Sequence, residues 1–179
     1  MKTITRILSL LTVLFFIGCS STQSLQEYYI DSAENPNFIS LDLPASILNL
    51  EQADLSESQR TAIQSLRKLN VLAFRKTASN NAEYEVEKGK VNAILKNKDF
   101  KELMKLNSQY GKGFVKYLGE EDAIDEVIIY GNMDDKGFAL VRVLGKDMNP
   151  AYLVQLMQAL QKSDYNGEGL GEIGQFLKG

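Results

Sequence analysis

Three apolar segments that follow one another late in the chain constrain its fold most. They are GFVKYLG (Gly113–Gly119), DEVIIYG (Asp125–Gly131) and GFALVRVLG (Gly137–Gly145). The joint NMDDK between the second and third segments is typical of a hairpin turn, which makes Asp134 and Asp135 predicted turn residues. Consecutive strands favour an antiparallel or mixed sheet.

The rest of the chain predicts two further strands and five helices. The strands cover Asn37–Pro44 and Leu69–Arg75. The helices cover Ser46–Leu50, Ser56–Lys68 and Asn81–Asn97, then a segment that starts at Asp99 and contains Phe100, Leu103 and Met104 on one face, and a last helix that starts at Asn149 and Pro150. In the last helix Leu153, Leu156, Met157 and Leu160 form one apolar stripe.

This order predicts an α+β fold. We expect a single domain, with a mixed or antiparallel sheet of about five strands and helices packed on one face. A chain of 179 residues is long enough to bury one core. The predicted boundaries are a signal peptide over 1–18, a lipidated cysteine and tether over 19–35, the domain over 36–163 and a Gly-rich flexible tail over 164–179.

The beginning of the chain has the pattern of a secretory signal. Lys2 and Arg6 precede an apolar run from Ile7 to Ile17, which is followed by Gly18 and the only cysteine, Cys19. The run is shorter than the ~20 residues that span a bilayer. Residues 16–19 resemble the lipobox of bacterial lipoproteins, although a Phe stands at position 16, where Leu is usual.

The lipobox resemblance implies a lipid anchor. Cleavage would follow Gly18, the Cys19 thiol would carry a diacylglycerol thioether, and the new amine would be acylated, as by palmitate. The alternatives are a plain secretory signal with an incidental cysteine, or an uncleaved membrane helix. Ser20 after the cysteine suggests, by resemblance to the sorting rules of such lipoproteins, the outer membrane of the cell envelope, with the domain facing the periplasm.

The composition excludes several classes of site. The chain contains no His and one Cys, so a Ser-His-Asp triad, a Cys-His dyad, an HExxH zinc site and a Cys-rich metal site cannot be built. A net charge of −3 gives no support for nucleic-acid binding. We therefore expect no enzyme activity, no cofactor and no metal.

Two residues are candidate ligand contacts. Arg142 lies in a strand between two valines, on the face of Leu140 and Leu144, where it could bind an anion or pair with an acid. Asp125 belongs to an acidic run that could hold calcium, but the run lacks EF-hand spacing and is better explained as a charged loop. The G-x-G-x-x-G motif at 169–174 follows a helix and is followed by only a short segment, so it does not predict a dinucleotide site.

Several longer stretches carry a resemblance to a family. They are SLQEYYIDSAENPNFISLDLPASIL, KLNVLAF, KYLGEEDAIDEVIIYG, KGFALVRVLG and DMNPAYLVQLMQALQKSD. Over roughly Ser24 to Asp164 the chain resembles the lipoprotein family known as domain of unknown function 4252. The resemblance implies a cell-envelope lipoprotein and supplies no catalytic or binding residues.

Three functions remain open. The leading hypothesis is a non-enzymatic envelope module that is anchored through Cys19 and binds a protein partner or senses a periplasmic signal. The rival is a small-ligand-binding or carboxylate-based hydrolytic domain that uses Asp125 or Arg142. A third hypothesis is a structural spacer near the outer membrane.

The lipid anchor can be tested directly. Replacing the only cysteine, Cys19→Ala, should abolish palmitate labelling of the protein in cells, because no other thiol can accept the diacylglycerol group. Labelling equal to that of the parent protein would contradict the lipoprotein hypothesis.

Overall fold

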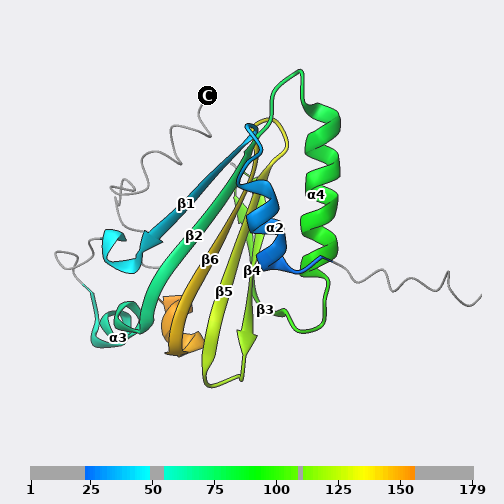
Figure 1. The fold of residues 1–179 in the computed structure, drawn as a ribbon. Coiled ribbons are helices and arrows are strands. Elements are labelled where there is room, and N and C mark those ends of the chain that lie inside the picture. The colour runs from blue at the N-terminus through cyan, green and yellow to red at the C-terminus, as the bar shows by residue number, and fades with distance from the viewer. Residues whose placement is uncertain (1–22, 49–54, 109–110, 156–179) are drawn as a thin grey trace, which may run out of the picture.

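The computed structural model describes residues 23–48, 55–108 and 111–155. The predicted signal peptide, Cys19 and the Gly-rich tail lie outside the described residues. In chain order (Figure 1) the elements are α2 (Leu25–Ser32), β1 (Phe38–Pro44), the 3-10 helix η1 (Ala45–Leu48), α3 (Glu57–Ser65), β2 (Leu66–Arg75), α4 (Asn81–Leu95), β3 (Lys101–Ser108), β4 (Gly111–Gly119), β5 (Ile124–Met133) and β6 (Gly137–Met148). A helical turn over residues 150–155 follows β6.

The sheet confirms the α+β class. It has six strands in the order β1-β2-β6-β5-β4-β3, where about five were expected, and every neighbouring pair is antiparallel. The predicted hairpin between β5 and β6 is present, with Met133 paired with Gly137. Gly137 has a φ of 125°, a conformation that residues with a side chain rarely adopt.

The helix predicted from Asp99 is wrong, because this segment is the edge strand β3. A register shift between Glu102 and Met104 marks a bulge in the pairing of β3 with β4. The bulge adds a residue to the strand and breaks its two-residue alternation. Phe100, Leu103 and Met104 therefore have a helix-like spacing in the sequence, although Leu103 and Met104 lie in a strand and Phe100 directly precedes it.

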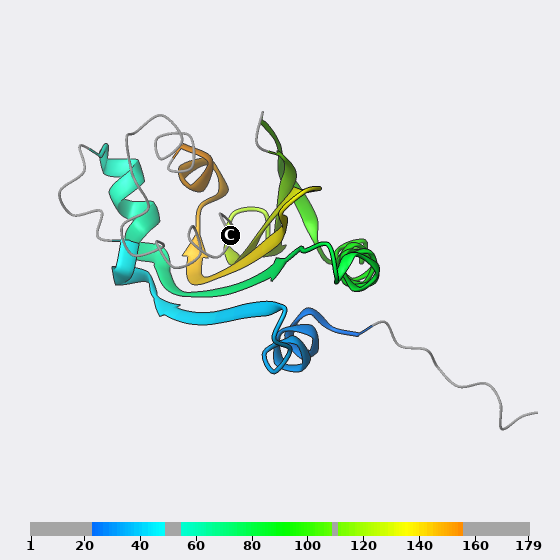
Figure 2. The ribbon, with the colours of Figure 1, turned by 90° about the horizontal axis from the view of Figure 1, so that it is seen from above.

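Helices lie on both faces of the sheet, which corrects the expectation of one face (Figure 2). On the α4 face, α2 and α4 pack against one core cluster that includes Leu72, Leu140 and Ile128. On the α3 face, α3 and the 150–155 turn belong with a second cluster that includes Leu69 and Val143. Both layers are needed because β2 and β6 carry apolar side chains on both sides.

Aromatic rings form the centre of the α4 face. Phe74 stacks on Phe138 with ring centroids 5.6 Å apart, and Phe38 meets Phe74 edge-on at 5.0 Å. Tyr28 from α2 and Tyr84 from α4 close this cluster from outside the sheet. The cluster therefore joins both helices to β1, β2 and β6.

Helix α2 belongs to the folded domain rather than to the predicted tether over 19–35. A capping box starts the helix: the Glu27 amide donates to Ser24 Oγ (3.2 Å), and the Ser24 amide donates to Glu27 Oε2 (2.8 Å). Tyr28 is 1% exposed, and its hydroxyl donates to Glu87 of α4 at 2.9 Å. Asn35, just after the helix, donates to Glu83 at 2.7 Å. The fold thus begins before residue 36.

Other helix ends are close to their predicted positions. Ser56 caps α3 as expected, but α3 ends at Ser65 and β2 follows without a loop. Asn149 Oδ1 accepts from the amides of residues 151 and 152, which confirms it as a cap. Leu153 is buried, whereas Leu156, Met157 and Leu160 lie outside the described residues. No helix among the described residues is long and apolar enough to cross a membrane.

The contact between α2 and α4 can be tested by deleting one hydroxyl. Tyr28→Phe leaves the Glu87 carboxylate, whose side chain is 9% exposed, without its buried donor. We expect a loss of about 1–3 kcal/mol in the free energy of unfolding, measured with urea. Glu85→Gln is the matched control, since this side chain is 59% exposed. Equal losses in the two variants would contradict the proposed role of Tyr28.

Candidate functional site

A cavity of about 340 Å³ lies between α2 and the strands β1, β2 and β6. Its lining residues come from one helix and its C-cap and from three strands: Gln26, Tyr29 and Ile30 of α2 with the following Ala33, Ser40 and Asp42 of β1, Lys68 and Asn70 of β2, and Arg142 and Leu144 of β6. The volume is at the small end of the range for small-molecule sites. This cavity is the candidate site.

Arg142 is held by an ion pair with Glu126 of β5. Its Nη2 donates to Glu126 Oε2 at 2.7 Å, and Nε lies 2.6 Å from Oε1 but off the direction of its N–H bond. The two side chains are 20% and 13% exposed. The hydrogen bond and the charge of Glu126 raise the pKa of Arg142, so the guanidinium stays charged and fixed in orientation.

Tyr29 places α2 over this part of the sheet. Its hydroxyl lies within hydrogen-bond distance of two backbone carbonyls of the β2–β6 pair, those of Leu140 (2.9 Å) and Asn70 (3.2 Å). Burial raises the pKa of Tyr29, and the phenol stays protonated at neutral pH. The uncharged hydroxyl of Tyr29 therefore holds α2, which forms one wall of the cavity, against the sheet.

A second ion pair lies at the outer rim of the cavity. Lys68 Nζ is 2.6 Å from Asp42 Oδ2, with side chains 44% and 63% exposed. Asn70 Nδ2 donates to the other oxygen of Asp42. The hydrogen bond from Lys68 lowers the pKa of Asp42. An exposed pair of this kind adds ~0–1 kcal/mol to stability and can exchange its partner for a ligand.

The charged side chains that line the cavity already have partners. Apart from them, the side-chain donors and acceptors of the lining are amides and hydroxyls. The pKa of Asp42, the carboxyl group at the rim, is lowered, whereas a general acid needs a raised pKa. The described part of the chain contains no group of three metal-ligating side chains.

The two residues predicted from the sequence are not together. Arg142 lines the cavity on the face of Leu140, as period two predicted, and it is paired with an acid. Asp125 is exposed at the start of β5 and does not line the cavity. Tyr29 is one of six tyrosines that the sequence offered for a recognition surface, whereas sequence reasoning missed Asp42 and Asn70. The two strand residues could have been found, since they are polar interruptions on the same face as Arg142.

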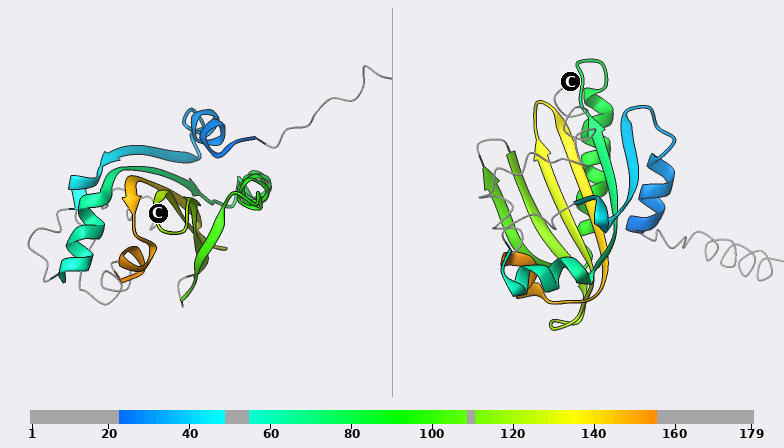
Figure 3. Two further views of the ribbon diagram at one scale, coloured as in Figure 1. Left: turned by 90° about the horizontal axis from the view of Figure 1, so that it is seen from below. Right: turned by 90° about the vertical axis from the view of Figure 1, so that its left-hand side faces the viewer.

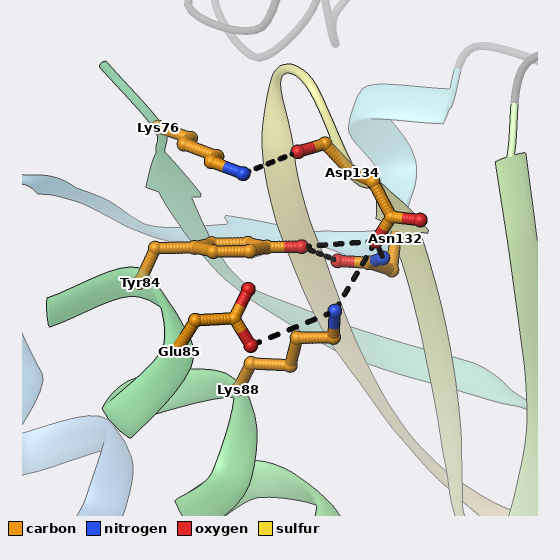
Figure 4. A network of polar contacts seen from close by, with 6 residues as sticks. All are labelled: Lys76, Tyr84, Glu85, Lys88, Asn132 and Asp134. Carbon is orange, nitrogen blue, oxygen red and sulfur yellow. Dashed lines mark hydrogen bonds and ion pairs between the residues drawn. The ribbon is translucent and has the colours of Figure 1, made fainter. Parts of the chain in front are cut away.

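A second polar cluster ties α4 to the β5–β6 turn (Figure 4). Tyr84 Oη donates to Asn132 Oδ1 at 2.7 Å, Lys88 Nζ lies 3.1 Å from Asp134 Oδ1, and Lys76 donates to the Asp134 carbonyl at 2.6 Å. Hydrogen bonds from Asn132 and Lys88 lower the pKa of Asp134. Asp134 is thus the turn residue that the sequence predicted. Its contacts hold the β5–β6 turn against α4, which gives this cluster a structural role.

The buried ion pair at the cavity can be tested by a mutant cycle. Arg142→Met leaves the Glu126 carboxylate buried without its cation, and we expect a loss of about 3–5 kcal/mol in urea unfolding. Adding Glu126→Leu should recover most of that loss, because it removes the orphaned charge. Lys68→Met, at the exposed pair, should cost no more than about 1 kcal/mol. A similar cost for Arg142→Met and Lys68→Met would contradict the assignment.

Comparison with known proteins gives one result. The family model described as Domain of unknown function (DUF4252) matches residues 28–156. No curated protein and no solved structure matches the chain. The matched range starts inside α2 and covers all six strands and every lining residue of the candidate cavity except Gln26. The chain therefore belongs to the DUF4252 family.

Proposed function

We propose that this protein is a lipid-anchored module of the cell envelope that binds a partner protein and has no catalytic activity of its own. The proposal places the domain at the outer membrane, facing the periplasm. The observation that carries it is the position of the predicted lipid attachment site, Cys19, immediately before a helix that is locked to the domain.

The short separation between Cys19 and α2 supports this proposal. The helix starts at Leu25, so the intervening chain reaches no more than about 20 Å when fully extended. Tyr28 and Tyr29 then fix α2 to α4 and to the sheet. An anchor at Cys19 would hold the folded domain close to the membrane surface, which suits a module that meets partners there.

The chemistry of the cavity supports a binding role. Arg142 and Lys68 are both neutralised by acids, and the hydrogen bond from Lys68 lowers the pKa of Asp42, the carboxyl group at the rim of the cavity. The chain has no His. Catalysis of hydrolysis by paired carboxylates would need one acid held protonated, whereas the pKa of Asp42 is lowered.

A crosslinking pull-down of the protein from intact cells tests this function. We expect one dominant envelope protein to be captured with the parent chain and to be reduced or lost with Cys19→Ala, since the unlipidated domain leaves the membrane surface. Ser21→Ala is the matched control because it keeps both Cys19 and Ser20, the residue that suggests the outer membrane. Capture at background level only, in the parent as in Cys19→Ala, would contradict the proposal.

The cavity favours a second candidate function, the binding of a small polar ligand. Its rim combines the exchangeable Lys68–Asp42 pair with Ile30, which is 63% exposed, so a ligand would find both charged and apolar contacts. Two results together would favour this alternative. No protein partner would be captured, and a metal, sugar, peptide or lipid would raise the melting temperature of the parent protein but not that of Arg142→Met.

A further inference from the structure

A row of three polar side chains crosses the strand side of the candidate cavity. Asp42 of β1, Asn70 of β2 and Arg142 of β6 lie directly opposite one another in the strand register, and all three line the cavity. The row interrupts a sheet face whose other residues, such as Leu72, belong to the apolar core. Contacts within the row and with Glu126 use most of its hydrogen-bonding groups. The groups that remain indicate what the cavity can bind.

Arg142 keeps free donors on the side away from Glu126. Its Nε and Nη2 face the Glu126 carboxylate. In the described part of the chain Nη1 has no hydrogen-bond partner, and it is not one of the buried polar atoms without a partner, so it is accessible. A guanidinium carries five N–H donors in a fixed plane. Nη1 can therefore donate to a ligand while the ion pair with Glu126 stays closed.

Asn70 supplies an unused acceptor next to this donor. The residue is 9% exposed, and its Nδ2 donates to a carboxylate oxygen of Asp42. A carboxylate only accepts hydrogen bonds, so this contact fixes the orientation of the amide and leaves Oδ1 for a ligand. None of the described residues donates to Oδ1. Because Asn70 is directly opposite Arg142, a donor and an acceptor lie side by side on the cavity wall.

The charges around the cavity favour a ligand with no net charge. Arg142 is balanced by Glu126, and Lys68 is balanced by Asp42. The charged guanidinium binds an anionic oxygen most strongly. A ligand with uncompensated negative charge, however, finds no excess positive charge here to offset the loss of its hydration. A zwitterion meets both conditions, since its carboxylate can accept from Nη1 and its ammonium can donate to Asn70 Oδ1.

Apolar side chains complete the lining around this polar row. Ile30, Ala33 and Leu144 line the cavity, and Ile30 is 63% exposed. Helix α2, which carries Ile30, lies on the face of the sheet opposite α3 (Figure 3), and Tyr29 holds it there. An aliphatic group of the ligand would lie against this apolar part of the lining.

We propose that the cavity binds a free α-amino acid with an aliphatic side chain. The carboxylate accepts from Nη1 of Arg142, and the ammonium on the neighbouring carbon donates to Oδ1 of Asn70. The side chain lies along Ile30 and Leu144. This inference rests on the second candidate function, ligand binding in the cavity, and names its ligand class. It depends neither on a partner protein nor on lipidation of Cys19.

A series of ligands tests the inference on the full-length protein by titration calorimetry. We expect saturable binding of leucine. Leucinamide lacks the carboxylate and isocaproate lacks the ammonium, so each should bind about tenfold more weakly or worse. No saturable binding of leucine, isoleucine or valine would overturn the inference. Binding of N-acetylleucine as tight as that of leucine would assign the cavity to the C-terminus of a peptide and would also overturn it.

A conservative variant tests the role of Nη1. Arg142→Lys keeps a cation for Glu126 but removes Nη1, and we expect the affinity for leucine to fall about tenfold or more. Arg75→Lys is the matched control, because Arg75 is an exposed residue of β2 outside the cavity. Equal affinities of Arg142→Lys and the parent would overturn the inference. If urea unfolding shows that Arg142→Lys does not fold, the ligand series on the parent decides alone.

This test and the pull-down fail separately. Capture of an envelope protein without any binding of leucine, isoleucine or valine would overturn this inference and leave the partner-binding proposal standing. Binding of leucine with the expected selectivity, but with no captured protein, would support the inference and contradict that proposal.

Discussion

Burial of β2 on both sides of the sheet determines where the other elements lie. Its residues from Leu69 to Phe74 are all buried, and successive side chains point to opposite faces. One face must be covered near Phe74 and Leu72, which α2 and α4 do, and the other near Leu69, which α3 does. Because α3 joins β2 without a loop, it can cover only the beginning of the strand.

Local patterns predicted those elements whose stability is local. The β5–β6 hairpin, α4 and the cap at Ser56 follow from turn residues, helical spacing and a capping box. The same capping pattern at Ser24 could have placed α2 in the domain. Edge strand β3 could not be identified in this way, because a bulge hides its alternation and its pairing with β4 decides its conformation. Likewise, the order of the segments could not show that helices lie on both faces of the sheet, because that arrangement depends on how they pack against β2.

The candidate site was predictable only in part. Alternation in β6 correctly assigned Arg142 to the face of Leu140. Its partner Glu126 depends on the pairing of β5 with β6, and a register irregularity between Ile124 and Glu126 sets which acid faces the guanidinium. Tyr29 reaches the site because α2 packs across strands distant in sequence. Contacts between distant segments thus form the cavity. The sequence alone indicated the position of Arg142 on its strand, but not the partners that surround it.

The two faces of the sheet differ in how they can recognise another molecule. On the α4 face, a ligand must compete with ion pairs that are already closed, and the more buried pair, Arg142 with Glu126, resists exchange. On the α3 face, the two rows of paired residues that pass through Val71 and Ala73 have no charged or hydrogen-bonding side chain. Apolar contact is not directional, so selectivity there must come from the fit to a concave sheet (Figure 2).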